Sequence, residues 1–410
     1  MRFIPLLLCV LFSWRAVAAD RQVFVAAMGI ERTPWSSGQW RWWHNGKHSP
    51  DVKDANGRRD ICSHVFYPAI GLYDAADPAY IEYRCQLLKM CGIDGISLSA
   101  YPRDEWVDRA LKTSGEYLNR YGIKATTRVQ SMVTIDQLDF FLHVLGPATW
   151  RIDGRPVLTF FSPGIKPNEL LAWKNKYPAE TRPLVFKWAS STVDPRWKGI
   201  LDGAYDWCGD DRRHPHRTDV KPYNRYFGLP QVKTAYHEDV DRAKQILRDG
   251  IITYYMDGVS PGFDNLGVNG WGKELIKCDR ENGQTYEWRW QQAIANPFSL
   301  VLIPTWDDWG ENTTIEPTVE YGNQYLEITR KYAAKYKGVA PSEGNLSVPE
   351  WIYKIRKMSA DPQILDQTTH ASTLIQHGNY LEAEKIVRPI FEKLPPPTGK
   401  YFDPLEATKH

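Results

Sequence analysis

The feature that most constrains the fold is a repeated alternation of short apolar, β-branched runs with helix-like segments. Eight runs predict strands, at Val23–Ala27, Gly95–Ser99, Lys124–Val129, Pro156–Phe161, Pro183–Trp188, Asp202–Trp207, Ile251–Met256 and Leu300–Thr305. Helical patterns lie between most of them, at Pro78–Cys91, Trp106–Tyr121, Ile135–Leu145, Asn168–Lys176, Glu238–Asp249 and Glu287–Ala295. Because neighbouring parallel strands need a crossover, this order predicts an α/β protein with a parallel sheet.

Eight such units favour a closed (β/α)8 (TIM) barrel over a doubly wound open sheet, since no Gly-rich dinucleotide loop follows the first strand. We expect the barrel to occupy residues 20–337. After a Gly- and Pro-containing linker, residues 345–395 carry three further helical patterns and predict a small C-terminal helical appendage packed on the barrel. The Pro-rich residues 396–410 predict a flexible tail.

The N-terminus has the pattern of a secretory signal peptide. A basic start is followed by a short apolar run and then by small residues, with cleavage expected near Ala18–Ala19. We therefore expect residues 1–19 to be removed and the protein to be secreted or periplasmic. No later run is long enough to predict a transmembrane helix. The five remaining cysteines are an odd number and resemble neither a zinc motif nor a dense disulfide framework.

Charge and aromatic content narrow the class of partner. The net charge is +2 with no dense basic run, which argues against nucleic acid as a binding partner. The chain contains 17 Trp and 22 Tyr, and flat amphipathic rings suit the apolar faces of sugars, although large cores also use aromatic residues. The sequence predicts no oligomeric state.

In a (β/α)8 barrel the chemistry lies at the carboxyl ends of the strands and in the loops that follow. The predicted strand ends carry polar and aromatic side chains, which are candidate substrate-binding residues: Tyr101, Arg128, Trp188, Trp207 and Asp257. After the last strand the chain reads Thr305-Trp306-Asp307-Asp308-Trp309-Gly310-Glu311. We expect Trp306 and Trp309 to form walls of the same site.

Asp308 and Glu311 are the candidate catalytic residues. Glycoside hydrolysis normally uses two carboxyl groups, one protonated and one ionised. Burial against indoles and a neighbouring carboxylate both raise the pKa of a carboxyl group, so two acids in one cleft can titrate apart. The alternative is that these acidic loop residues cap the next helix or face water.

The stretch from Thr305 to Pro317 resembles the motif of glycoside hydrolase families 99 and 71, which also place two carboxylates three residues apart. Family 99 contains endo-α-mannosidases and endo-α-mannanases, and family 71 contains endo-α-1,3-glucanases. Residues 65–78, with Tyr73, are similar to a family 99 stretch, as is Val259-Ser260-Pro261-Gly262-Phe263-Asp264 with the later Trp271 and Arg280. The similarity extends over residues 22–335, and the fold it implies is the barrel.

The resemblance implies that Asp308 activates the attacking group and that Glu311 is the general acid. Family 99 has Glu at the first position and is described as retaining through the substrate's 2-hydroxyl, whereas family 71 has Asp and is described as inverting through water. The stereochemical outcome therefore stays open, as does the role of Asp307, which replaces an Asn favoured in both families.

Three segments depart from the family 99 pattern: the first strand lacks the usual tyrosines, Ser99-Ala100-Tyr101 lacks a tryptophan, and Trp40 to Asn45 matches only in part. The resemblance and the aromatic content still indicate substrate contacts for Trp43, His44, Tyr73 and Asp264, and Trp35, Trp40 and Trp42 are further candidate sugar platforms.

The sequence thus predicts a secreted glycoside hydrolase that cleaves internal α-glycosidic bonds of a polysaccharide or oligosaccharide of the α-mannan or α-glucan type. The alternative is a catalytically inactive glycan-binding protein on the same barrel. No cofactor or metal is predicted, because the His-rich Arg213-His214-Pro215-His216 lacks spaced carboxylate partners and predicts a surface loop.

Overall fold

A computed structural model describes residues 20–161, 164–188, 193–208, 214–395 and 399–407. The predicted signal peptide, residues 1–19, lies outside the described residues. None of the helices in the described ranges is long and apolar enough to cross a membrane.

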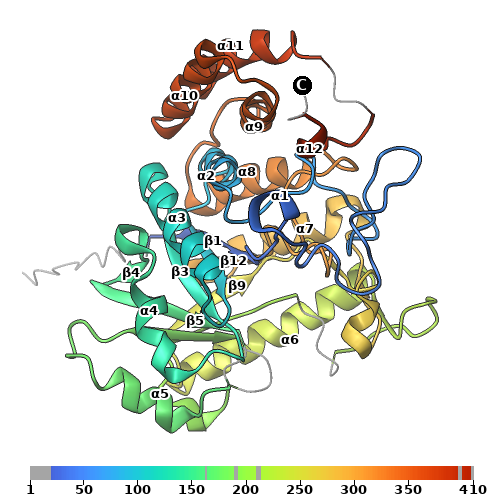
Figure 1. Ribbon diagram of the computed structural model, residues 1–410. Helices are drawn as coiled ribbons and strands as arrows, with labels where there is room; N and C mark the ends of the chain where they lie inside the picture. The colour runs from blue at the N-terminus through green and yellow to red at the C-terminus, as the bar shows by residue number, and fades with distance from the viewer. Residues whose placement is uncertain (1–19, 162–163, 189–192, 209–213, 396–398, 408–410) are drawn as a thin grey trace, which may run out of the picture.

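Eight parallel strands close into the predicted barrel (Figure 1). They run in the order β1 (Gln22–Ala27), β2 (Gly95–Ala100), β3 (Lys124–Val129), β5 (Arg155–Phe160), β6 (Leu184–Trp188), β7 (Gly203–Tyr205), β9 (Tyr254–Gly258) and β12 (Leu300–Pro304). Pairing of β1 with β12 closes the ring, with Gln22 opposite Leu300 and Ala26 opposite Pro304. A short antiparallel strand, β4 (Arg151–Ile152), pairs with β5. The sequence predicted all eight barrel strands, with shifts of a few residues at their ends.

Strand β1 shows how side-chain alternation divides the core. Phe24 and Ala26 join the cluster inside the barrel, whereas Val23, Val25 and Ala27 pack in the layer between the strands and the helices. The interior is filled tightly: a Cβ added at Gly95 would lie 2.1 Å from the ring of Phe24. The barrel is therefore a packed core, and a ligand site has to lie at its end.

Helices surround the barrel: α2 (Pro78–Met90), α3 (Glu105–Tyr121), α4 (Leu138–His143), α5 (Pro167–Lys174), α6 (Leu229–Arg248), α7 (Gln284–Ala295) and α8 (Gln324–Lys337). Asp77 caps α2 by accepting a hydrogen bond from Ala79, ahead of Pro78 in the first turn. Helix α6 begins nine residues before the predicted Glu238. A small second sheet, made of β8 (Arg225–Phe227), β10 (Phe263–Asp264) and β11 (Ile276–Cys278), lies in the loops after β7 and β9.

The C-terminal appendage consists of α9 (Val348–Met358), α10 (Pro362–Gln376) and α11 (Tyr380–Phe391), which lie beyond α2 and α8 (Figure 1). Helices α9 and α10 pack on α2, and Lys357 of α9 forms an ion pair with Asp77 at 2.6 Å. The appendage thus packs against the outer side of α2.

The expectation of a flexible tail is wrong for residues 399–407. Tyr401 packs against Tyr67 with ring centroids 4.8 Å apart, and Phe402 is buried. Asp403 forms an ion pair with Arg59 at 2.7 Å, just before the short helix α12 (Pro404–Ala407). Aromatic anchors and a buried ion pair therefore fix this segment to the loop that follows α1 (Pro34–Ser37).

Candidate active site

The carboxylate loop emerges from β12 at the carboxyl end of the barrel. The Asp308 backbone N–H donates to the Thr305 hydroxyl at 3.0 Å. The Glu311 backbone N–H donates to the Asp308 carboxylate, also at 3.0 Å. The loop turns at Asn312, whose φ of 48° is left-handed, as is tolerated best by Asn and Gly. This tight turn places both candidate catalytic carboxyl groups on one loop.

Both acids line a cavity of about 210 Å³, hereafter the central cavity. Its wall is built from side chains at or just beyond the ends of six barrel strands: Met28, Tyr101, Arg128, Phe161, Trp207 and Asp308. The remaining lining residues are Glu31, Trp42, Trp43, Asn45, Cys62, Gln130, Trp271, Trp309, Gly310 and Glu311. Aromatic faces with a few converging polar groups are what a small-molecule or sugar site requires.

The environment of Asp308 raises the pKa of its carboxyl group above the value in water. Its side chain is 8% exposed, and burial, with a contribution from the neighbouring Asp307, raises its pKa to about 6. The backbone N–H groups of Glu311 and Gly310 and the Arg128 guanidinium oppose this rise. A carboxyl group with a pKa near the working pH is suited to take up and release a proton.

Glu311 reaches the mouth of the central cavity, where the indole N–H of Trp271 donates to its carboxylate at 2.9 Å. Trp271 packs against Trp42 with ring centroids 5.7 Å apart. Both tryptophans have left-handed backbones, with φ of 54° and 73°, which is rare for bulky residues and concentrates at functional sites. The two indoles therefore form one wall of the cavity, and holding them there requires a strained backbone at both residues.

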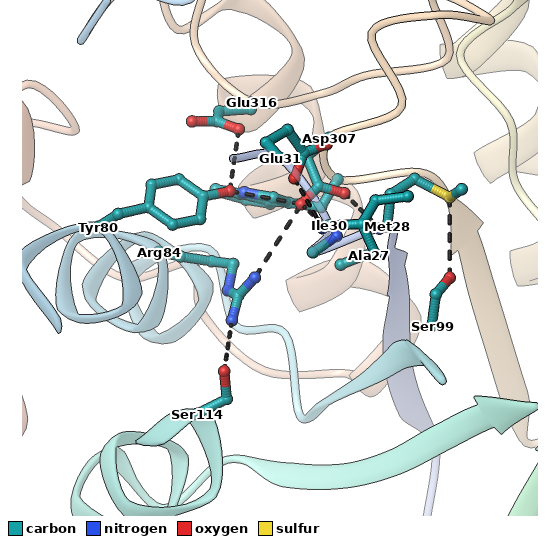
Figure 2. A network of polar contacts seen from close by, with 12 residues as sticks. Ala27, Met28, Ile30, Glu31, Tyr80, Arg84, Ser99, Ser114, Asp307 and Glu316 are labelled. Atoms are coloured by element: carbon teal, nitrogen blue, oxygen red, sulfur yellow. Dashed lines mark hydrogen bonds and ion pairs between the residues drawn. The ribbon is translucent and has the colours of Figure 1, made fainter. Parts of the chain in front are cut away.

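Asp307, next to Asp308 in sequence, points the other way, into a buried polar network (Figure 2). Its carboxylate accepts hydrogen bonds from the backbone N–H groups of Met28 at 2.5 Å and Gly29 at 3.2 Å. The Tyr80 hydroxyl lies 3.4 Å from the same carboxylate, and the Arg84 guanidinium lies at 4.0 Å. Asp307 therefore ties the last strand to the end of the first.

Two further carboxyl groups, Glu31 and Glu316, belong to this inner network (Figure 2). Glu316 accepts from the hydroxyls of Tyr73 at 2.7 Å and Tyr80 at 3.3 Å. Burial, followed by the charge of Asp307, raises the pKa of both Glu31 and Glu316 well above the ordinary value. Asp307 has the backbone donors and Arg84, so we infer that it carries the charge and that Glu31 and Glu316 hold protons.

The structure brings seven of the predicted site residues to the central cavity: Asp308, Glu311, Trp43, Tyr101, Arg128, Trp207 and Trp309. Arg128 lies over the Trp207 ring at 4.8 Å and donates to the Ser99 hydroxyl at 2.7 Å, so its cation is fixed at the floor. Of the other proposed sugar platforms, only Trp42 lines the cavity. The ring of Trp35 packs edge-on against Trp40 at 5.1 Å, outside it.

Six predicted substrate-binding residues do not line the central cavity. Trp306 is fully buried, and Tyr73 stacks on Tyr80 at 3.7 Å. Asp257 lies within β9 instead of after it and accepts hydrogen bonds from Tyr236 and Asn296, because the strand begins later than the apolar run indicated.

The other three support or border the site. The Asp264 carboxylate accepts from the Tyr223 hydroxyl at 2.8 Å, and its carbonyl accepts from Asn312. Trp188 stacks behind Phe161, with ring centroids 4.9 Å apart. His44 is exposed on the loop that carries Trp42 and Trp43.

Sequence reasoning missed Glu31 as a cavity residue and gave Trp271 no role in the site. Glu31 lies four residues beyond β1, so the rule that strand ends carry the chemistry would have found it if applied to the whole loop. Trp271 lies in the long excursion after β9, and its contact with Glu311 joins residues 40 positions apart. No local pattern signals that contact.

In the described ranges no group of three or more His, Cys, Asp or Glu side chains is placed to hold a metal ion. His214 is buried, and its ring Nε2 lies 3.4 Å from Asp239 and 3.6 Å from Glu238. The expectation that this histidine belongs to a surface loop without acidic partners is therefore wrong, while Arg213 lies outside the described residues.

A closed (β/α)8 barrel with two carboxyl groups and several indoles in one cavity at its carboxyl end has the architecture of a glycoside hydrolase. Solved structures agree on the fold. The GH99 endo-α-mannosidase from Bacteroides thetaiotaomicron superposes with a TM-score of 0.59 at 17% identity, covering 77% of this chain and 98% of that one. A structure described as a glycoside hydrolase-like protein gives a TM-score of 0.50 at 13% identity, covering 76% and 94%.

Sequence comparison finds relatives that are described as mannosidases. The glycoprotein endo-α-1,2-mannosidase of Rattus norvegicus is 23% identical over 329 residues, covering 71% of this chain and 66% of the relative. That of Mus musculus is 22% identical over 332 residues with the same coverage. The sequence model of a family described as a domain of unknown function (DUF5010) matches residues 184–346. These matches confirm the resemblance to family 99 and support a glycoside hydrolase, while the resemblance to family 71 stays a prediction. The chain spans about two thirds of the length of these curated relatives, 66% in both cases.

Proposed function

We propose that this protein is an endo-acting glycoside hydrolase that cleaves internal α-glycosidic bonds of an α-mannan or α-glucan type glycan. The observation that carries the proposal is the placement of Asp308 and Glu311 on one tight loop in an indole-lined cavity at the carboxyl end of the barrel. The endo-α-mannosidase relatives support the α-mannan side of the proposal. The signal-like N-terminus supports a secreted or periplasmic location.

In the proposed mechanism, Asp308 is the base. With a pKa of about 6 it is ionised at neutral pH and still basic enough to take a proton from the attacking hydroxyl group. That hydroxyl belongs either to the sugar itself, as in family 99, or to a water molecule, as in family 71. The shorter Asp in place of Glu leaves more room before the base, and the anomer of the first product distinguishes the two routes.

Glu311 is the proposed general acid, which protonates the leaving oxygen. The Trp271 indole N–H donates to its carboxyl group at 2.9 Å and so orients that group in the cavity. The cation of Arg128 lies in the same cavity and offsets part of the negative charge around Asp308. Trp42, Trp43 and Trp309 offer apolar faces for the sugar rings.

The test is to incubate the purified protein with α-mannans and α-glucans of defined linkage and to separate the products by size. Short oligosaccharides that disappear with Glu311→Gln support the endo-hydrolase. The matched control is Glu116→Gln, an exposed glutamate on α3, which should leave the products unchanged. Binding of a glycan without products from any polymer would instead favour the glycan-binding alternative.

The pH dependence gives a second test of the same assignment. Because the base must be ionised, kcat/KM should rise about tenfold per pH unit below about pH 6 and level off above it. NMR of the first-formed anomer should be recorded in the same reaction. An acidic limb that lies at the same pH in a slow but active Asp308→Asn variant would show that another group is the base.

A further inference from the structure

A second cavity of about 160 Å³ lies beside the central cavity. Trp42 and Tyr101 line both cavities, and their rings meet edge to face with centroids 6.1 Å apart. A glycan chain that leaves the central cavity on this side would therefore enter the second one, hereafter the side cavity. Nothing in the proposed mechanism uses it.

The side cavity differs from the central cavity in its charge. Two of its lining residues are arginines, Arg32 and Arg41, and none of its lining residues is acidic. They face each other across an antiparallel bridge, in which each backbone N–H donates to the other residue's carbonyl. Like charges directly opposite each other are unfavourable, so this pair needs a compensating anion.

Asp104 provides part of that compensation. Its carboxylate lies 2.8 Å from the Arg32 guanidinium and 3.9 Å from that of Arg41. Among the described residues, Asp104 is the one carboxylate within ion-pair distance of the two guanidinium groups, so one of their two charges has no ion-pair partner of its own. Asp104 also caps α3 by accepting from the Val107 N–H at 2.7 Å, which fixes its position.

The two arginines of the side cavity differ in their exposure to solvent. Arg32 is 6% exposed, lies over the Trp106 ring at 4.2 Å, and its Nε–H is buried without a hydrogen-bond partner in the described part of the chain. The Arg41 side chain is 49% exposed. A guanidinium held this firmly is a pre-organised donor for an oxyanion, which it binds through parallel N–H groups. The exposed one is free to close over a ligand.

We propose that the side cavity is a subsite for a sugar unit that carries an oxyanionic substituent, so that the natural substrate is an acidic α-glycan. The substituent is a carboxylate, a sulfate ester or a phosphate ester, since all three present the oxygens that arginine recognises. The indole of Trp42 and the rings of Tyr101 and Trp106 supply apolar faces for the sugar ring. This inference rests on the proposed function and names the substrate class of that same site.

Binding tests the inference directly in the full-length Glu311→Gln protein, which should bind oligosaccharides without hydrolysing them. The probes are an α-linked mannotriose, an α-linked glucotriose, and derivatives of each with one 6-carboxylate, 6-sulfate or 6-phosphate at either terminal unit. By titration calorimetry at low salt, a charged derivative should bind about tenfold tighter than its neutral parent. The advantage should shrink as salt is raised, and the tightest derivative identifies the substituent.

Two substitutions should move this advantage in opposite directions. Arg41→Gln removes one positive charge from a half-exposed position and should weaken binding of the charged derivative far more than that of the neutral parent, which abolishes most of the advantage. Asp104→Asn keeps a residue that caps α3 and removes the carboxylate that the two guanidinium groups share, so it should strengthen binding of the charged derivative. The control is Arg109→Gln, an exposed arginine of α3 that lines neither cavity and should change nothing.

Equal affinity for neutral and charged derivatives would overturn the inference, as would no binding of any probe. An advantage that survives Arg41→Gln and falls with Arg109→Gln would overturn it as well. Failure of the proposed function is separate: the wild-type protein would then hydrolyse no neutral or acidic α-glycan, although the dependence of binding on Arg41 would remain. Hydrolysis of neutral glycans without any preference for charged ones would defeat only the subsite.

Discussion

Two consecutive aspartates on the loop after β12 have opposite environments. Asp307 is fully buried, accepts two backbone hydrogen bonds and lies near Arg84. Asp308 opens into the central cavity, where no lysine or arginine forms an ion pair with it in the described residues. The tryptophans beside them divide in the same way, since Trp306 is fully buried and Trp309 lines the cavity. The loop therefore has an inner face, which builds the barrel, and a cavity face, which is available to a ligand.

The difference teaches that residue type alone does not mark a functional acid. Both aspartates have raised pKa values through burial, but only Asp308 combines this with access to a cavity. Glu316 is the extreme case: its pKa is raised well above normal, and its hydroxyl partners Tyr73 and Tyr80 are fully buried. Among the perturbed acids of this loop, those on the inner face serve the structure, and Asp308 on the cavity face is a candidate for chemistry.

The largest expected effect comes from a substitution on the cavity face. Asp308→Asn should lower kcat by about 10²–10⁴-fold, because it removes the proposed base. Its unfolding midpoint in urea should stay the same or rise, since the Asn oxygen still accepts from the Glu311 N–H and no buried charge remains. Unchanged kcat in this variant would show that the two faces are not functionally distinct.

The second-largest expected effect comes from a substitution in the network behind the inner face. Arg84→Met removes the cation beside Asp307 and should lower the free energy of unfolding by about 3 kcal/mol, because a buried charge loses its partner. Urea denaturation measures the loss, with the exposed Arg109→Met as the control. Activity per folded molecule should persist at low temperature. Lost activity at unchanged stability would place Arg84 with the cavity face instead.

The third prediction uses pH to sharpen the comparison. Burial raises the pKa of Glu316 above its unfolded value, so the folded state holds a proton that the unfolded state releases. The stabilisation from this proton is complete below about pH 4.5 and is lost as pH rises through the folded-state pKa. Glu316→Gln mimics the protonated form and should flatten the fall in stability that sets in as pH rises above about 4.5. An equally steep fall in the variant would mean that Glu316 is ionised in the folded protein.

The barrel was predictable because each of its strands can be recognised from a short stretch of sequence. Each strand is a short β-branched run, and the eight runs recur with helical patterns between them, so errors at the ends, such as the late start of β9, did not change the topology. The cavity face was predictable in part for the same reason, since Asp308 and Glu311 directly follow a strand.

The inner face was not predictable from spacing. Whether Tyr73, Asp257 or Trp306 points to the cavity depends on side-chain direction, which changes with a shift of one residue in strand register or turn. The partners that decide their roles, such as Tyr236 for Asp257, lie on separate elements. Likewise, the residues that line the side cavity come from the loop after β1, from the end of β2, from α3 and from the loop after β3, which no single motif contains.

The smallest expected effect concerns two indoles that both line the central cavity but direct their N–H groups to different faces. Trp271 donates to Glu311 at 2.9 Å, and Trp309 donates to the Tyr73 hydroxyl at 2.9 Å. Trp271→Phe keeps an aromatic face but loses the donor to Glu311, the proposed general acid, so kcat should fall about five- to tenfold with little change in KM. Trp309→Phe is the matched control: it should lower the free energy of unfolding by about 1 kcal/mol and leave kcat within about twofold. Steady-state kinetics of both variants measure kcat and KM, and urea denaturation measures their free energy of unfolding. Equal losses of kcat in both variants would mean that the indoles act only as sugar platforms, and that the division into an inner and a cavity face does not extend to their N–H groups.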